Sequence, residues 1–381
     1  MNSLDMKIIE RLDLGEYATF KPNKDLPRHR WFYFKEGFAR DLVLYLLRKF
    51  NIKENQWVLD PFMGVGTTPL TCREYGVNTI GVEISPLFKM IAEAKIEDYD
   101  VDDIKKYLEY LLNYREKVDI GGIHGLLKKA FPKPSLIDIL RIRNAIENIA
   151  ERRYRNFFYV ALLSAANKSS YMIKDGSKLK IGRRRVPPFI DMFRRTVKMM
   201  TKDIGDTELK DIEYQLYQGD ARRMTMVEDE SIDLIITSPP YLNKIEYTSI
   251  YEIEYLIVYG DTQVNPIRSY IGLTFSRRHI LEIPKVGGET LPPAAHAYFN
   301  DMYMVLEEVY RVLKHGRKAV FVVGQGIFPD RVIPSDEILA KLARKIGFKK
   351  PEIWVINRRI AVRDRTIKIG VANESILILQ K

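Results

Sequence analysis

The stretch that decides the fold is residues 56–68, Gln56-Trp57-Val58-Leu59-Asp60-Pro61-Phe62-Met63-Gly64-Val65-Gly66-Thr67-Thr68. Its first five residues predict a short buried strand, which Pro61 ends because proline has no N–H to give to a sheet. A glycine-rich turn follows, and a helix is expected from there to Glu74. Residues 78–83 predict a second apolar strand that ends in an acid. Strand, turn, helix and strand within about 30 residues indicate a βαβ unit and a parallel sheet.

The same alternation returns in the second half of the chain. We expect strands at 231–237, 318–323, 353–356 and 375–379, and helices at 300–313 and 337–346. Between residues 100 and 210, apolar residues recur at three- and four-residue steps, which is typical of helices. The prediction is an α/β fold with a mostly parallel, Rossmann-like sheet and helices on both faces. Residues 1–99 and 211–381 would form this core, and 100–210 a mainly helical insertion.

The composition is that of an ordinary globular protein, with 381 residues, 46% hydrophobic and 29% charged. No apolar run reaches the ~18 residues needed to span a bilayer, and the first residues contain no apolar signal segment, so we expect a cytoplasmic protein. Cys72 is the one cysteine, which excludes a disulfide framework within the chain. The five histidines never fall at metal-ligand spacing, so we expect no structural metal.

The chain is basic, with 61 Lys and Arg against 50 Asp and Glu, a net charge of +11. Such an excess favours a polyanionic partner, although a merely basic surface is the alternative. The basic stretch 171–202 could line a phosphate track, with Tyr171, Phe189 and Phe193 as stacking surfaces, or could be a solvated loop and helix face. A second basic cluster lies at 358–365. The nucleic-acid contacts that we predict are Lys178, Lys180, Arg183, Arg184, Arg185, Arg194 and Arg195.

The glycine-rich turn lies at the carboxyl end of the first strand, where doubly wound folds bind their ligands. Glu83 follows Asp60 by 23 residues and ends the next strand, where a carboxylate can accept hydrogen bonds from both hydroxyls of a ribose. These features predict a site for a nucleoside cofactor. The third glycine of the dinucleotide pattern is missing, which disfavours nicotinamide. For the turn alone, a simple tight turn without a ligand stays open.

A second motif follows an isoleucine-rich strand, Thr237-Ser238-Pro239-Pro240-Tyr241. Its two prolines fix the backbone and provide no N–H donors, so the carbonyls of Ser238 and Pro239 can point into a cleft as acceptors. Tyr241 would present a flat face and a hydroxyl. Acceptors beside an aromatic ring suit a planar amine such as a nucleobase. Two prolines alone would indicate no more than a rigid turn.

Together the two motifs resemble those of the S-adenosylmethionine-dependent amino-methyltransferases, which methylate the exocyclic amine of cytosine or adenine in nucleic acid. The resemblance covers the sheet domain and implies a Rossmann-like methyltransferase fold. It implies catalytic roles for Ser238, Pro239, Pro240 and Tyr241. It implies cofactor contacts at Asp60, Pro61, Phe62, Gly64, Gly66, Thr67 and Thr68 in the loop, Glu83 and Ile84 at the ribose, Asp220 and Ala221 at the adenine, and Trp31 at the methionine end.

The resemblance also bears on the substrate. In that family, Ser in the first catalytic position is typical of cytosine N4, so Ser238 favours cytosine over adenine N6. With this order of motifs the family often recognises its target through the intervening region, here 100–210. RNA is narrowly favoured, as in an archaeal branch that modifies ribosomal RNA, because the insertion has no recognisable duplex-reading module and a loop base costs little to unstack. Modification of DNA at cytosine N4 (or adenine N6) is the alternative.

Three other functions fit the sequence less well. Methylation at cytosine C5 needs a thiolate, but Cys72 follows the glycine turn in a helix, where core packing is expected. A non-catalytic nucleic-acid-binding protein would explain the charge but not the paired motifs. A methyltransferase for a small molecule or a protein amide is disfavoured by Ser238 and by the positive charge.

Overall fold

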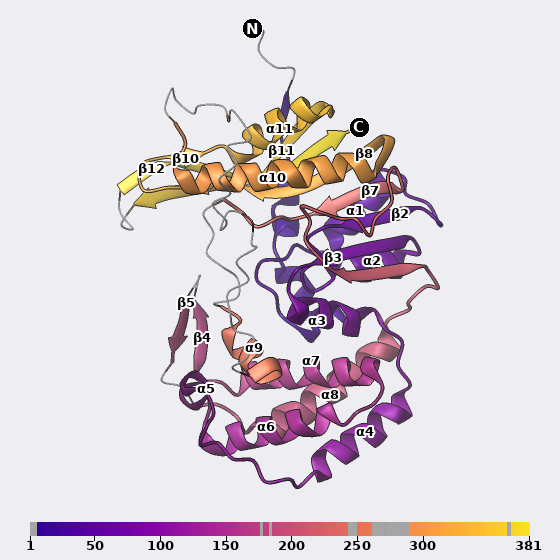
Figure 1. Ribbon diagram of the computed structural model, residues 1–381, viewed down its shortest axis with the longest axis vertical. Helices are drawn as coiled ribbons and strands as arrows, with labels where there is room; N and C mark the ends of the chain where they lie inside the picture. The colour runs from indigo at the N-terminus through magenta and orange to yellow at the C-terminus, as the bar shows by residue number, and fades with distance from the viewer. Residues whose placement is uncertain are drawn as a thin grey trace.

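The computed structural model describes residues 6–175, 178–182, 185–242, 250–260, 271, 283, 290–363 and 367–381. Within these residues an eight-stranded sheet forms the upper part of the molecule in Figure 1, and a group of helices forms the lower part. The strands of this sheet are β1 (Lys7–Glu10), β2 (Trp57–Asp60), β3 (Asn78–Glu83), β6 (Tyr214–Gln218), β7 (Ile232–Thr237), β8 (Leu313–Gly324), β11 (Lys349–Arg363) and β12 (Ile367–Gln380).

The strand order in the sheet is β1-β11-β12-β8-β7-β2-β3-β6. The run β8-β7-β2-β3-β6 is parallel throughout, and β1 is parallel to β11. β12 is antiparallel to both of its neighbours, β8 and β11. The predicted α/β fold with a mostly parallel sheet is confirmed, and the carboxyl ends of β2, β3 and β7 meet at one edge.

Helices cover both faces of the sheet because successive strand residues point to opposite sides. Ile235 packs with α10 (Pro293–Val312) and α11 (Ser335–Ile346) on one face. Leu234 and Ile236 pack with α1 (Arg40–Lys49) and α2 (Thr67–Tyr75) on the other. The helix expected at 300–313 is α10. It begins earlier than expected, at Pro293, and it ends at Val312, directly before β8.

The residues between β3 and β6 are mainly helical, and most of these helices lie below the sheet in Figure 1. α3 packs against α7, which joins the two parts of the molecule. A two-stranded hairpin, which the periodicity did not predict, interrupts these helices. The elements are α3 (Pro86–Ile96), α4 (Val101–Asn113), α5 (Gly125–Ala130), α6 (Lys133–Glu147), α7 (Arg152–Lys168), β4 (Met172–Asp175), β5 (Lys178–Ile181) and α8 (Phe189–Asp206).

The remaining elements are short. α9 (Glu252–Tyr259) comes from the later part of the chain but shares the apolar core of the helical part. The others are the strands β9 (Gly326–Ile327) and β10 (Val332–Ile333) and the 3-10 helices η1 (Leu12–Ala18), η2 (Lys21–Lys24) and η3 (His29–Trp31). None of the helices in the described part of the chain is long and apolar enough to cross a membrane.

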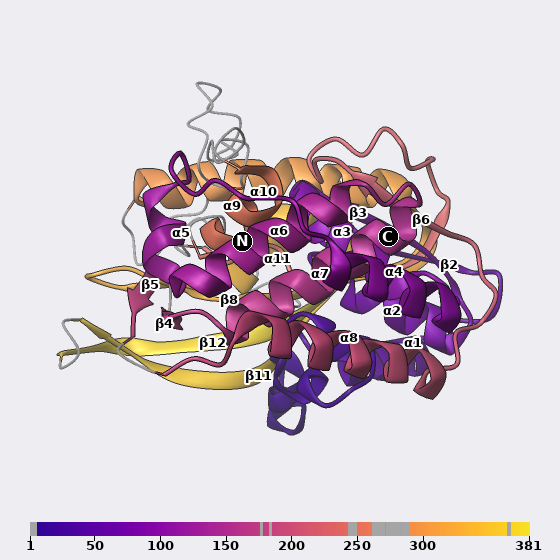
Figure 2. The same ribbon diagram turned by 90° about the horizontal axis from the view of Figure 1, so that it is seen from below.

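The β11–β12 hairpin is longer than the two short late strands that we expected. Its pairing extends from Lys349 opposite Gln380 to Arg363 opposite Ile367. The hairpin therefore projects beyond the ends of the other strands, on the left in both ribbon views (Figures 1 and 2). The projecting part begins at Asn357 and Glu374, where Glu374 pairs with Gly324 at the end of β8, and it is close to Tyr241, which follows β7.

Candidate active site at the carboxyl edge of the sheet

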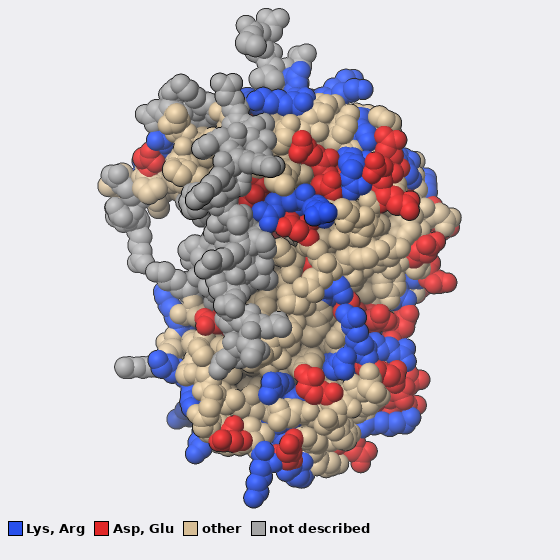
Figure 3. Space-filling model, in the orientation of Figure 1, with Lys and Arg blue, Asp and Glu red and all other residues tan. Residues whose placement is uncertain are grey.

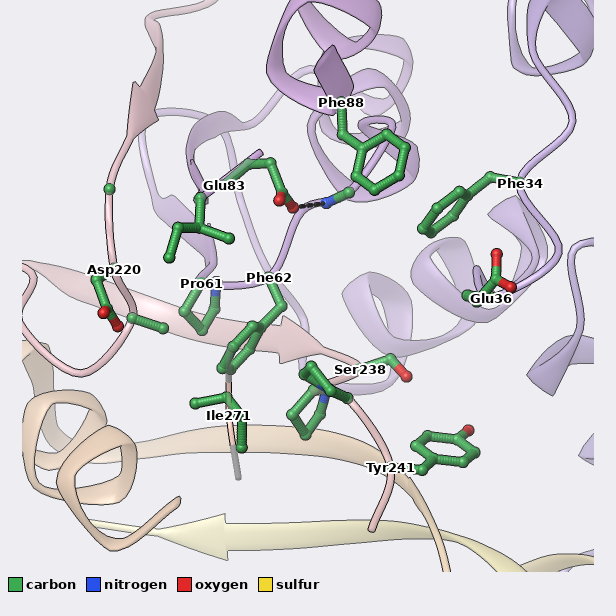
Figure 4. Close-up of a pocket in the computed structure, with 16 residues that line it drawn as sticks. Phe34, Glu36, Pro61, Phe62, Glu83, Phe88, Asp220, Ser238, Tyr241 and Ile271 are labelled. Atoms are coloured by element: carbon green, nitrogen blue, oxygen red, sulfur yellow. Dashed lines mark hydrogen bonds between the residues drawn. The ribbon is translucent and has the colours of Figure 1, made fainter. Parts of the chain in front are cut away.

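A pocket lies where β2, β3 and β7 end, and both sequence motifs border it (Figure 4). It contains about 750 Å³ of space without protein atoms, part of it open to solvent. The lining residues are Phe34, Glu36, Pro61, Phe62, Gly64, Glu83, Ile84, Phe88, Gly219, Asp220, Ala221, Ser238, Pro239, Pro240, Tyr241 and Ile271. Residues separated by some 170 positions in the chain thus surround one space of the size that small-molecule ligands occupy.

Asp60 holds the two motifs together from behind the pocket. Its Oδ1 accepts hydrogen bonds from the N–H of Phe62 at 3.0 Å and from Oγ1 of Thr237 at 2.7 Å, and its Oδ2 accepts one from Oγ1 of Thr68 at 2.7 Å. Burial raises the pKa of this carboxyl to about 6. The residues from the predicted cofactor set that do not line the pocket are Asp60, Gly66, Thr67, Thr68 and Trp31.

The turn between β2 and α2 needs its glycines. Gly66 has φ +83°, and a Cβ there would lie 2.8 Å from Cβ of Ala92. Gly64 has φ +52°, and its N–H donates to Oε2 of Glu83 at 2.9 Å. Side chains are therefore disfavoured at both positions, and at Gly64 the main chain itself forms part of the pocket wall.

Glu83 is a pocket carboxylate that the main chain holds in place. Besides the bond from Gly64, its Oε1 accepts a hydrogen bond from the N–H of Ser85 at 2.8 Å. Burial raises the pKa of Glu83 to about 7, against the opposing effect of these N–H groups. Each oxygen keeps acceptor capacity on the pocket side, which fits the paired hydroxyls of a ribose.

Asp220 lies at the end of the pocket farthest from Tyr241 (Figure 4), and Ile84 and Ala221 line the same pocket. The guanidinium of Arg222 contacts both carboxylate oxygens, at 2.6 to 3.1 Å, and also donates to Asp301 at 3.1 Å. Asp220 is therefore oriented by an ion pair at its position beside the pocket.

Ser238, Pro239, Pro240 and Tyr241 form the opposite end of the pocket, directly after β7. The hydroxyl of Tyr241 donates to Oε1 of Glu374 on β12 at 2.7 Å. Its ring lies against Gly324, where a Cβ would be only 2.5 Å from Cδ2 of the ring. The tyrosine ring is thus fixed in position by the C-terminal strands.

Trp31 does not lie at the pocket, contrary to our expectation. It is fully buried, its Nε1 donates to Oδ2 of Asp203 on α8 at 3.0 Å, and its ring packs edge-on to Phe157 at 5.4 Å. Its large apolar surface and its single N–H are both satisfied in the core of the helical part.

Phe34, Glu36 and Phe88 also line the pocket, although we did not predict them from the sequence. Phe34 and Phe88 pack edge-on with ring centroids 5.0 Å apart. The Glu36 carboxylate accepts a hydrogen bond from the hydroxyl of Tyr251 at 2.7 Å. Phe34 and Glu36 lie just past Trp31, which the resemblance placed at the methionine end, so this position was a usable signal. Phe88 lies on an apolar helix and gave none.

The predicted nucleic-acid contacts are only partly described. Lys180, Arg185, Arg194 and Arg195 are exposed, whereas Lys178 is described only in its main chain. Arg183 and Arg184 lie outside the described residues. In the face that Figure 3 shows, Lys and Arg side chains lie among Asp and Glu side chains.

Two of the aromatic residues expected to stack on nucleic acid are buried instead. Phe189 and Phe193 are completely inaccessible and stack on each other in the core, with centroids 5.7 Å apart. They form the apolar face of α8, so their spacing marks core packing. Lys174, from the same basic stretch, forms an ion pair with Glu254 and lies 3.9 Å from the centre of the Tyr251 ring.

The described residues contain no group of three or more His, Cys, Asp or Glu side chains able to hold a metal ion.

The sequence matches the N6/N4 methyltransferase family, described as DNA methylase, at residues 16–94 and 232–381. The chain belongs to this DNA methylase family. It is therefore an S-adenosylmethionine-dependent nucleic-acid methyltransferase, and the resemblance is confirmed.

Relatives align along most of the chain. Type II methyltransferase M.BsoBI of Geobacillus stearothermophilus is 24% identical over 90% of this chain and 82% of its own length. Type II methyltransferase M.AvaI of Nostoc sp. is 27% identical over 93% and 87%. An arsenic(III) S-adenosylmethionine methyltransferase structure from Chlamydomonas reinhardtii is 13% identical, with a TM-score of 0.35, over 86% of this chain and 64% of that one. The narrow preference for RNA finds no support here, because the family description favours the DNA alternative.

Proposed function

We propose that this DNA methylase family member transfers a methyl group to the exocyclic N4 of cytosine in DNA. The observation that carries the proposal is the shared pocket, because the glycine turn and the Ser238–Tyr241 segment border the same space. The family description supports DNA as the polymer. Ser238 in the first position of the second motif supports cytosine N4.

The pocket fits S-adenosylmethionine along its length. Asp220 and Ala221 would contact the adenine, and Glu83 would accept hydrogen bonds from the ribose hydroxyls. At the other end, the Glu36 carboxylate suits the ammonium group of the methionine part and lies near Ser238 in Figure 4. When bound, the cofactor supplies an electrophilic methyl group on a sulfonium.

The protein's main task at the target is to change the geometry of an amine. The N4 lone pair of cytosine is conjugated with the ring, which makes it a poor nucleophile. Ser238 (through its hydroxyl or its carbonyl) and the carbonyl of Pro239 would accept the two amine hydrogens and draw the nitrogen toward tetrahedral geometry. The freed lone pair then points toward the methyl-donor end of the pocket. One of the two held protons must leave after transfer, and it leaves along these hydrogen bonds to solvent.

Tyr241 would stack on the target base and fix its plane. Its ring is already held by Glu374 and Gly324, so stacking costs little conformational entropy. A base in a duplex must be flipped out to reach this position. Positioning and prearranged dipoles, and not a strong base, would supply most of the rate acceleration.

The helical insertion, 100–210, would bind the polymer around the target. The family match leaves residues 95–231 uncovered, which is consistent with a segment specific to this chain's own target. The exposed Arg185, Arg194 and Arg195 would contact phosphates. Residues 1–99 and 211–381 would form the catalytic core.

Competition between polymers tests the proposal. The enzyme is incubated with labelled S-adenosylmethionine and equal masses of genomic DNA, ribosomal RNA and ribosomal particles. Label should enter the DNA. Label confined to RNA would overturn the DNA assignment, and no label in any polymer would overturn the proposed function.

A further inference from the structure

A second pocket adjoins the first at Tyr241. It contains about 380 Å³ of space, part of it open to solvent, where the projecting part of the β11–β12 hairpin begins. Its lining residues are Tyr241, Gly324, Asn357, Arg359, Ala372, Asn373 and Glu374. Tyr241 belongs to both linings, so a group in this pocket lies directly beside the ring on which the target base would stack.

The strand register makes one wall of this pocket polar. Asn357 and Arg359 are two residues apart on β11, so they share a face of the sheet, and they pair with Glu374 and Ala372 on β12. Arg359 offers several donors, and Glu374 offers acceptors beyond the one that Tyr241 uses. Ala372 is small and buried, which leaves room between these polar groups.

This combination of groups selects the kind of ligand. Ser238 and Pro239 do not line the second pocket, so a group bound here is not the reacting amine. A phosphate would face the Glu374 carboxylate, which repels it. A nucleobase edge offers acceptors to an arginine and donors to a carboxylate at the same time.

We propose that the second pocket binds the nucleobase next to the methylated one, and that Arg359 reads its edge. The inference rests on the proposed function, because it places a polynucleotide at Tyr241. Arg359 is then a residue that determines the sequence context of methylation. Glu374 contributes to both pockets, since it holds Tyr241 and offers acceptors to the neighbouring base.

Arg358 provides a matched control. It is the adjacent residue, is also exposed, and forms an ion pair with Glu10 away from the second pocket. Replacing either arginine by alanine removes one positive charge from the same hairpin. Only the change at Arg359 removes a group from the pocket.

The experiment measures sequence context with the full-length chain. A duplex library with random positions around cytosines is methylated with S-adenosylmethionine, and the methylated sites are read by sequencing. Wild type should prefer one base beside the methylated position. Arg359→Ala should reduce that preference about tenfold or more, whereas Arg358→Ala should keep it. Arg359→Lys keeps the charge but not the planar fork, so it should also lose the preference.

Three results would overturn the inference. In the first, the wild-type enzyme shows no base preference beside the methylated position. In the second, Arg359→Ala keeps the wild-type preference. In the third, Arg359→Lys keeps the wild-type preference. The last would indicate a contact with charge alone. Binding of S-adenosylmethionine by calorimetry verifies that each variant is folded. Failure of the wild type to methylate any DNA would instead reject the proposed function.

Discussion

The ends of β2 and β3 lie side by side in the sheet, and each carries a buried carboxylate. At the end of β2, Asp60 uses its oxygens entirely within the protein, on Phe62, Thr68 and Thr237. At the end of β3, Glu83 takes two main-chain N–H groups and still borders the pocket. The two carboxylates at this sheet edge therefore have different roles. Asp60 connects the two motifs, and Glu83 faces the ligand.

The largest effect is expected for Asp60→Ala, which tests the connecting role of this carboxylate. The change leaves two threonine hydroxyls and one N–H without an acceptor, so the free energy of unfolding should fall by about 3 kcal/mol or more. Activity should fall with it. Denaturant unfolding followed by circular dichroism measures the loss. Asp60→Asn keeps one acceptor and should lose less. If Asp60→Ala unfolded at the same denaturant concentration as the wild type, the result would contradict the connecting role of Asp60.

Glu83→Gln should separate binding from stability. The amide keeps the shape of the side chain but loses the charge that strengthens hydrogen bonds from ribose hydroxyls, so the Kd for S-adenosylmethionine should rise about a hundredfold. The free energy of unfolding should change much less, because removal of the buried charge offsets the loss of an acceptor for one of the two N–H groups. Calorimetry and denaturant unfolding measure the two effects. Equal cofactor affinity in the variant would place the ribose elsewhere.

Ser238→Ala extends the comparison to the end of β7. If the hydroxyl accepts an amine hydrogen, kcat should fall about tenfold while the Kd for S-adenosylmethionine stays unchanged. Single-turnover methylation of DNA measures the rate. An unchanged rate would assign the acceptor role to the main-chain carbonyl, and a weakened cofactor affinity would contradict the division of the pocket into two ends.

Through the ionisation of Glu83, a rise in pH should change cofactor affinity and protein stability in opposite directions. Burial raises its pKa to about 7 in the folded protein. Its contribution to stability is therefore present below the unfolded pKa and lost as pH rises through about 7. Cofactor affinity should instead rise, about threefold between pH 6.5 and pH 7.5, as the carboxylate ionises. Glu83→Gln should flatten this rise, and an equal slope in both proteins would assign the titration to another group.

Tyr241→Phe should have the smallest effect. It removes the bond to Glu374 but keeps the ring against Gly324, so the KM for DNA should rise about twofold and the cofactor affinity should not change. Tyr241→Ala, which removes the ring, should weaken DNA capture much more. Equal KM values for the two variants would contradict stacking by the ring.

The sequence could predict the centre of the fold because its signals are local. The strands around Asp60 and Glu83, the glycine turn and the proline pair are each determined by neighbours within a few residues. Their meeting at one edge follows from the parallel sheet. A sequence motif does not say whether a side chain points toward the ligand or away from it. We therefore expected Asp60, Gly66 and Thr68 at the ligand, although they stabilise the loop and do not line the pocket.

The features that were missed depend on distant contacts. Trp31 and Phe193 carry apolar rings that suit either a binding surface or a core, and only the packing of the helical part decides. Phe34 and Glu36 reach the pocket through a segment that has no regular secondary structure. The length of the β11–β12 hairpin is set by pairing between its own strands. The sequence did not reveal this length, because residues 357–359 are all polar and do not alternate with apolar residues.

The identity of the methylated atom tests the central claim most directly. DNA methylated by the wild-type enzyme is digested to nucleosides and analysed by mass spectrometry with reference standards. The shared pocket predicts N4-methylcytosine as the product, absent when the enzyme is omitted. N6-methyladenine or C5-methylcytosine as the sole product would contradict the role assigned to Ser238 and the carbonyls beside it.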